Sequence, residues 1–255
     1  MNLKTLKTLT VALFLLVGLT LFQGVALADV QLTVIGTPTY NSLGGVYTSP
    51  YQFQINNGPT ITLLACDDFL TEIYFGFSWP ATVNTLDSVG AMGPQKFTHA
   101  TNAVTYPYDK DYTPPSTAPT DPTIQQQYYA AAWLTDQLLN GSVDPASLEG
   151  AYYSYAIWQI FDPTAYLGYN GQSLSGAQQD QVSMAMVAAF AAIANPGTDE
   201  YLDSTMRIYT PDGVTSQEFI GFSVPEASTV AFLAFNFLAL VGIILLMRRR
   251  TRRNA

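Results

Sequence analysis

The chain has 255 residues, of which 11% are charged, and a formal net charge of −9 at neutral pH. Residues 29–223 hold only three basic residues against 18 acidic ones, and the resulting charge of −15 excludes nucleic acid and anionic lipid as partners of this segment. The chain has a single cysteine, so it can form no intrachain disulfide.

Residues 1–28 have the pattern of a secretory signal peptide. Lys4 and Lys7 precede a short apolar run, and Ala26 and Ala28 place small side chains where a signal peptidase reads. We expect cleavage before Asp29 and export of the rest of the chain. A retained membrane anchor is the alternative, but the apolar run is short for a membrane span.

The first half of the exported segment is rich in residues that favour β-strands. Partial alternation over 30–35 and 47–55, and an apolar run over 60–65, predict three strands. The turn signal Asn-Asn-Gly-Pro at 56–59 predicts a hairpin between the last two. Residues 73–79 are a further aromatic strand candidate, whereas residues 86–122 lose regular periodicity and predict an exposed loop.

In the second half the periodicity becomes helical. Three helices are expected, at residues 124–138, 147–161 and 175–194. Asp121 followed by Pro122 is the expected start of the first helix, and the second is apolar on nearly every side, which predicts burial. Strand candidates at 206–209 and 218–222 predict a closing hairpin. Strands, then helices, then strands indicate one α+β domain over residues 29–223.

Three carboxylates near the end of the 60–65 strand form the densest acidic cluster: Asp67, Asp68 and Glu72. Such a group could bind Ca²⁺, or a pair within it could hydrolyse a glycan. The simpler interpretation is a hydrogen-bonded strand end. His99 is the only histidine, and the sequence has no histidine-based metal motif and no hydrolase motif. We therefore expect a protein that is not an enzyme and needs no cofactor, with Ca²⁺ as the one candidate ion.

Aromatic side chains raise the hypothesis of carbohydrate binding. Trp79, Tyr106, Tyr108 and Tyr112 lie in or near predicted loops, where ring faces could stack on sugars. The alternative is ordinary packing of these rings in the core and the loops.

Cys66 is expected either to be a small buried group or to be a reactive thiol. It follows a predicted strand, and Ala156-Ile157-Trp158 lies on a predicted buried helix. In this pairing the chain resembles the thioester domains of bacterial surface adhesins, which join a strand cysteine to a glutamine in a Thr-Gln-x-Ala-Ile-Trp helix motif. Here Tyr153 and Ser154 replace the threonine and the glutamine, and Gln159 lies after the motif. The resemblance implies the scaffold without the covalent bond.

The C-terminal segment has three parts in order. Residues 224–229 read Val224-Pro225-Glu226-Ala227-Ser228-Thr229, and residues 230–247 are apolar except for Asn236. At about 1.5 Å per residue, a helix over this run would span the hydrocarbon core of a membrane. Within residues 248–255, five arginines predict a cytoplasmic end: Arg248, Arg249, Arg250, Arg252 and Arg253.

This arrangement resembles the PEP-CTERM sorting tail of exosortase substrates in Gram-negative bacteria, with Ala227 in place of the second proline. The resemblance implies processing by an exosortase-like enzyme in the inner membrane and a place at the cell surface or in the extracellular matrix, often beside exopolysaccharide. We therefore expect an exported surface protein with a binding or structural domain. An extracytoplasmic glycan hydrolase is the alternative.

Overall fold

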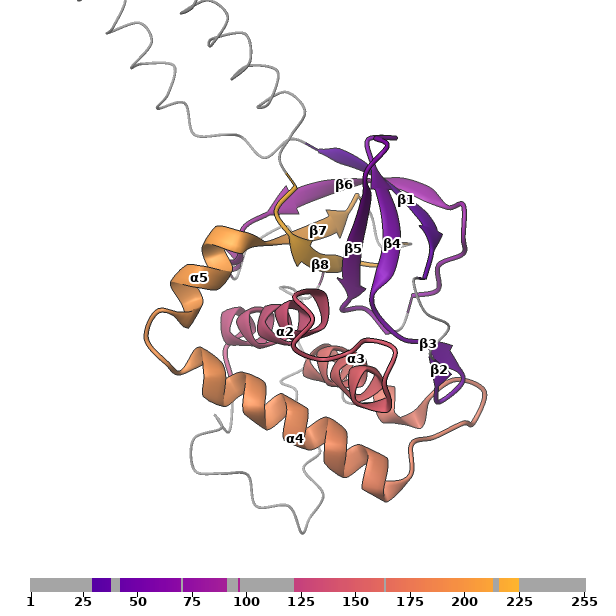
Figure 1. The fold of residues 1–255 in the computed structure, drawn as a ribbon, viewed down its shortest axis with the longest axis vertical. Helices are drawn as coiled ribbons and strands as arrows, with labels where there is room; N and C mark the ends of the chain where they lie inside the picture. The colour runs from indigo at the N-terminus through magenta and orange to yellow at the C-terminus, as the bar shows by residue number, and fades with distance from the viewer. Residues whose placement is uncertain are drawn as a thin grey trace, which may run out of the picture.

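The computed structural model describes residues 29–37, 42–69, 71–90, 96, 122–162, 164–212 and 216–224. Its elements, in chain order, are β1 (Val30–Gly36), β2 (Ser42–Leu43), β3 (Val46–Tyr47), β4 (Tyr51–Ile55), β5 (Ile61–Cys66), β6 (Ser78–Asn84), the 3₁₀ turn η1 (Leu86–Ser88), α2 (Ile124–Leu139), α3 (Leu148–Phe161), the 3₁₀ turn η2 (Ala165–Leu167), α4 (Gly176–Ile193), α5 (Thr198–Thr205), β7 (Met206–Pro211) and β8 (Phe219–Phe222). Six strands close an antiparallel barrel in the order β1-β4-β5-β8-β7-β6, and the helices pack against one side of it (Figure 1). The α+β class is therefore confirmed, with a closed barrel as its β part.

The hairpin between β4 and β5 forms where the turn signal placed it. Asn56 and Asn57 both have φ of 54°, a left-handed conformation that asparagine tolerates. The Gly58 N–H donates to the Ile55 carbonyl at 2.9 Å, and the two strands pair antiparallel. The strand expected over 47–55 is instead split into β3 and β4, because Pro50, which lacks an N–H, interrupts the ladder.

The strand expected at residues 73–79 lies further along the chain. β6 begins at Ser78, and Trp79, Ala81 and Val83 alternate into the core. The preceding segment turns outward, since the Phe77 N–H donates to the Tyr74 carbonyl at 3.1 Å. β6 then pairs with both β1 and β7, and these two pairings close the barrel.

The three expected helices are present, with small shifts at their ends. α2 begins after Thr123, whose hydroxyl accepts the Gln126 N–H at 3.2 Å while the Gln126 side chain accepts the Thr123 N–H at 2.9 Å. The start proposed at Asp121 is therefore replaced by this capping box two residues later, and Asp121 lies outside the described residues. α3 begins after Ser147, whose hydroxyl accepts the Gly150 N–H. The short helix α5 was not foreseen, because it lies in a polar stretch with little periodicity.

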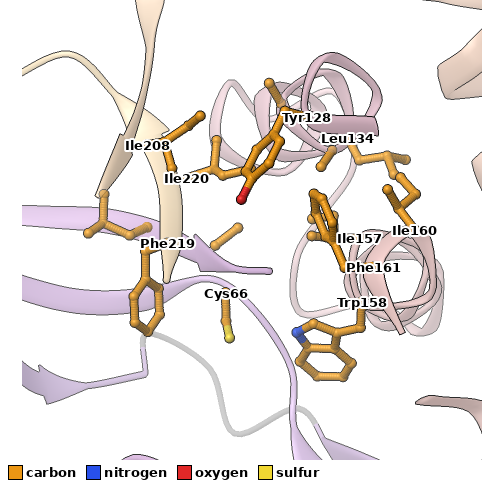
Figure 2. Packing of buried hydrophobic residues seen from close by; sticks show 14 of the residues in the cluster. Cys66, Tyr128, Leu134, Ile157, Trp158, Ile160, Phe161, Ile208, Phe219 and Ile220 are labelled. Atoms are coloured by element: carbon orange, nitrogen blue, oxygen red, sulfur yellow. The ribbon is translucent and has the colours of Figure 1, made fainter. Parts of the chain in front are cut away.

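The barrel and the helices share one core. α2 packs against β5 and β8, and α3 and α4 pack against α2. In Figure 2, Tyr128 of α2 lies between the strand residue Ile220 and α3, where its ring centroid is 4.8 Å from that of Phe161. The expectation that α3 is buried on most sides is confirmed. The closing hairpin is also confirmed, since β7 and β8 pair antiparallel.

Candidate functional site

Cys66, the last residue of β5, is fully buried. Its backbone N–H donates to Ser49 Oγ at 3.1 Å. Its thiol donates to the Asp68 carbonyl oxygen at 3.2 Å, and Sγ accepts the Asp68 N–H at 3.4 Å. Burial raises the pKa of the Cys66 thiol well above its usual value, and the neighbouring carboxylates raise it further. Cys66 is therefore a protonated, hydrogen-bonded thiol in the core. This agrees with the prediction of a small buried group rather than a reactive thiol.

Ser154 of α3 lies next to this strand end. It is fully buried, and its hydroxyl donates to the Gly150 carbonyl at 3.2 Å and reaches the Ser49 carbonyl at 3.4 Å. One turn later, Trp158 presents its indole nitrogen on the side of the ring that faces the Cys66 sulfur (Figure 2), and this contact opposes in part the rise in the pKa of the thiol that burial causes. The fold thus brings together the strand cysteine and the helix position that the thioester motif would occupy.

The carboxylate directly after Cys66 belongs to a buried pair. Asp67 continues the β5–β8 register and lies opposite Glu218, to whose carbonyl its N–H donates at 3.4 Å. Both side chains are fully buried. Glu218 accepts hydrogen bonds from the Thr210 hydroxyl at 2.5 Å, from the Lys96 N–H at 3.0 Å and from the Tyr128 hydroxyl.

Asp67 receives no such donors. Neither of its carboxyl oxygens is hydrogen-bonded by a donor among the described residues. Burial, the charge of Glu218 and the charge of Asp68, in that order, raise the pKa of Asp67 well above its usual value. Burial raises the pKa of Glu218 as well, while the hydrogen bonds from Thr210, Tyr128 and Lys96 act in the opposite direction. The buried pair therefore favours binding a proton, and the donors around Glu218 favour Asp67 as the protonated partner.

Asp68 points to a different partner, the ammonium group of the half-buried Lys96, with which it forms an ion pair. The ammonium also donates to Thr71 Oγ1 at 2.8 Å and to the Ser216 carbonyl at 3.1 Å. The Gln217 side-chain amide donates to the Asp68 carbonyl at 2.9 Å. These bonds tie the end of β5 to the segment before β8, so Asp68 is fixed within the core.

Glu72 does not join the other two acidic residues. It is exposed, and it accepts hydrogen bonds from Tyr74, at 2.6 Å, and from Tyr169. Within the described ranges no three histidine, cysteine or acidic side chains are grouped as a metal site, so the proposed Ca²⁺ group of Asp67, Asp68 and Glu72 is not assembled. Sequence reasoning missed Glu218, because its pairing with Asp67 joins residues far apart in the chain.

Of the four aromatic residues suggested for carbohydrate binding, the structure describes only Trp79. Trp79 is buried, with its ring 6.0 Å from that of Phe53 between centroids, so its proposed role on the surface is wrong. Its position on the inward face of β6 explains the burial. Tyr106, Tyr108 and Tyr112 lie outside the described residues.

Most of the terminal signals also fall outside the described residues. These are the signal peptide 1–28, the sorting motif from Pro225 to Thr229, the apolar run 230–247 and the arginines of 248–255; only Val224 of the motif is described. Among the helices that the structure does describe, none has the length and hydropathy needed to cross a membrane.

Comparison with solved structures gives a distant likeness of shape. No protein-family model matches the chain, and no curated protein matches it. Among solved structures, the N-terminal domain of the pilus tip adhesin Cpa from Streptococcus pyogenes aligns over 76% of this chain and 93% of that domain, with 14% identity and a TM-score of 0.39. At this level of similarity the likeness assigns no function.

Proposed function

We propose that this protein is exported to the cell surface or the extracellular matrix, where its domain acts by binding or as a structural element. The observation that carries the proposal is the burial of the acidic strand end. Asp67 and Asp68 are 0% and 1% exposed, and they are bonded or packed within the core. These two carboxylates interact with other core groups and are not open to a substrate. This arrangement suits a domain with a stable, non-enzymatic role.

The alternative, a glycan hydrolase, needs two carboxyl groups on either side of a sugar bond. Of the three acidic candidates only Glu72 is exposed, and its described partners are tyrosine hydroxyls. Incubation of the domain with oligosaccharides, followed by a reducing-end assay, tests this alternative. We expect no release of sugars, and release that is lost in a Glu72→Gln variant would favour the hydrolase.

We further propose that the tail directs the chain to an exosortase-like processing enzyme. The support is the order of the Pro225-Glu226 motif, the apolar run and the arginines. The experiment replaces the five arginines of residues 248–253 with serine and follows membrane residence and maturation of the chain. A variant with five lysines, which keeps the positive charge, is the matched control.

We expect slow or misdirected maturation in the serine variant and normal maturation in the lysine variant. Unchanged maturation in both variants would argue against a sorting role for this end of the chain. The test depends on the tail alone, so it is independent of what the domain binds.

A further inference from the structure

Large aromatic side chains gather on the surface near the β2–β3 hairpin. They come from three segments: the hairpin itself, the loop between β5 and β6, and the turn after η2. Their exposed fractions lie between 47% and 58%. We call this group the aromatic patch; its members are Tyr47, Tyr74, Phe75, Phe77 and Tyr169. Exposed apolar groups are common singly, but a cluster of this kind marks an interaction surface.

Direct contacts hold the rings of the aromatic patch next to one another. The rings of Tyr47 and Phe75 have centroids 6.3 Å apart, and those of Tyr74 and Phe77 are 5.7 Å apart. Glu72 lies between two of the segments, since it accepts hydrogen bonds from the hydroxyls of Tyr74 and Tyr169. The patch is therefore one surface built around a single carboxylate.

The backbone beneath the patch is fixed by hydrogen bonds and close packing. The Gly76 N–H donates to the Val34 carbonyl at 2.8 Å, which docks the β5–β6 loop on β1. The Tyr169 N–H donates to the Gly44 carbonyl at 2.8 Å, which docks the turn after η2 on the β2–β3 hairpin. A Cβ atom at Gly168 would lie 2.7 Å from the Gly44 carbonyl oxygen, so only glycine permits this approach. A surface held in this way binds a ligand with little loss of conformational entropy.

The chemistry of the patch combines ring faces with a hydrogen-bond acceptor. The hydrogen bonds from Tyr74 and Tyr169 lower the pKa of Glu72, so its carboxylate is ionised near neutral pH. The same bonds raise the pKa of both tyrosines, which keep their protons. Ring faces stack on the C–H faces of sugars, and carboxylate oxygens accept hydrogen bonds from sugar hydroxyls.

The charge of the domain restricts the ligand further. Residues 29–223 carry a net charge of −15, and the centre of the patch is itself negative, so an acidic polymer or an anionic membrane would be repelled. Several adjacent rings on one surface suit a chain of sugars better than a single sugar. The tyrosine hydroxyls and the carboxylate also favour a hydroxyl-rich ligand over an apolar protein surface.

We propose that the aromatic patch, with Glu72 at its centre, is a binding surface for polysaccharides that lack acidic groups. This inference rests on the proposed function as a binding domain and names its ligand class and its surface. The ring faces supply most of the affinity, and Glu72 orients the sugar hydroxyls.

The test uses the purified domain and calorimetric titration with three probes. Two are neutral oligosaccharides, of β-linked glucose and of N-acetylglucosamine, and the third is an acidic oligosaccharide from alginate. Tyr74→Ala, Phe75→Ala and Glu72→Gln are the test variants. Tyr201→Ala is the matched control, because Tyr201 is 46% exposed on α5, which lies on the opposite side of the molecule from the β2–β3 hairpin (Figure 1).

We expect saturable binding of at least one neutral probe, no binding of the acidic probe, and affinity that rises with the length of the sugar chain. Each of the two alanine variants should weaken binding by about tenfold. Glu72→Gln should weaken it less, and Tyr201→Ala should leave it unchanged. Thermal unfolding of each variant checks that the fold is intact, which we expect because the replaced side chains are exposed.

Two outcomes would overturn the inference. If the wild-type domain bound none of the neutral probes, or bound the acidic probe more tightly, the proposed ligand class would be wrong. If neutral probes bound equally well to the wild type and to the patch variants, the ligand class would stand and the surface would be wrong. Neither outcome bears on surface location, which the arginine replacements test separately.

Discussion

Cys66 and Ser154 are linked through a single residue, Ser49. The hydroxyl of Ser49 accepts the Cys66 N–H, and its carbonyl accepts the Ser154 hydroxyl at 3.4 Å. A strand end and a helix that are almost ninety residues apart in the sequence are thereby held together in the core. The helix position beside the cysteine is Ser154, whose side chain is a hydroxyl. A thioester would require the side-chain amide of a glutamine at this position.

The first prediction concerns the state of Cys66. Because the thiol is buried and burial raises its pKa, it should react slowly with iodoacetamide in the native domain and rapidly in denaturant. The intact mass should equal that of the unmodified chain. A mass lower by one ammonia, with a thiol that stays blocked in denaturant, would instead reveal a thioester to a side-chain amide.

Replacement of Cys66 with serine should lower the free energy of unfolding by about 1–2 kcal/mol, since a hydroxyl costs more to bury than a thiol and the position is fully buried. Cys66→Ala, which removes the sulfur without adding a hydroxyl, is the matched control and should cost a similar or smaller amount. Urea denaturation measures both. If a Cys66 variant lost oligosaccharide binding but kept its free energy of unfolding, the interpretation of Cys66 as a purely structural residue would be wrong.

The second prediction concerns pH. Burial raises the pKa of Asp67 in the folded domain, whereas an unfolded aspartate ionises at about pH 4. Above that pH, Asp67 must take up a proton when the chain folds. Its contribution to the free energy of unfolding is therefore fully present below about pH 4 and is lost as pH rises toward the folded pKa of Asp67. Asp67 contributes at most about 1.4 kcal/mol per pH unit to the slope of the free energy of unfolding against pH.

Urea denaturation at a series of pH values from about 4 to 8 measures the effect. Asp67→Asn should reduce the slope, because an amide cannot ionise. Replacement of the exposed Asp180 by asparagine is the control and should preserve the slope. The other charged groups around the site are Asp68, Glu218 and Lys96; an equal slope in the wild type and in Asp67→Asn would mean that the proton is held elsewhere among them.

The third prediction concerns the ion pair between the half-buried Lys96 and the buried Asp68. Lys96→Met should destabilise the domain by about 3 kcal/mol, because it leaves the Asp68 charge buried without its partner. The double variant with Asp68→Asn should lose less, since it removes the stranded charge. Chemical denaturation of both variants and of Lys96→Arg checks this. A loss in the double variant as large as that in Lys96→Met would show that the stranded charge of Asp68 is not what destabilises the single variant.

The fourth prediction concerns the mature N-terminus. We expect cleavage before Asp29, whose carboxylate accepts a hydrogen bond from the Thr82 hydroxyl at 3.0 Å and so anchors the start of β1 on β6. Edman sequencing of protein exported by the native host should begin Asp-Val-Gln. If the exported protein gave a sequence that starts at Met1, the predicted removal of residues 1–28 would be wrong.

Features that depend on neighbouring residues could be predicted from the sequence alone. The β4–β5 turn follows from the dihedral preferences of Asn56 and Asn57, and the ends of α3 follow from Ser147 and Asp162. The burial of α3 follows from its composition. Each of these depends on local backbone geometry or on the polarity of a single segment, so a short stretch of sequence is sufficient.

Features that depend on distant segments came from the tertiary structure. The sequence gives no register between β5 and β8, so it could not place Glu218 opposite Asp67 or Lys96 against Asp68. It also predicted one strand for the aromatic run from 73 to 79, whereas only Trp79 points into the barrel and Phe75 and Phe77 point outward. The inward or outward position of a ring is decided by which strands close the barrel, and that closure depends on the packing energy of the whole core rather than on any local pattern.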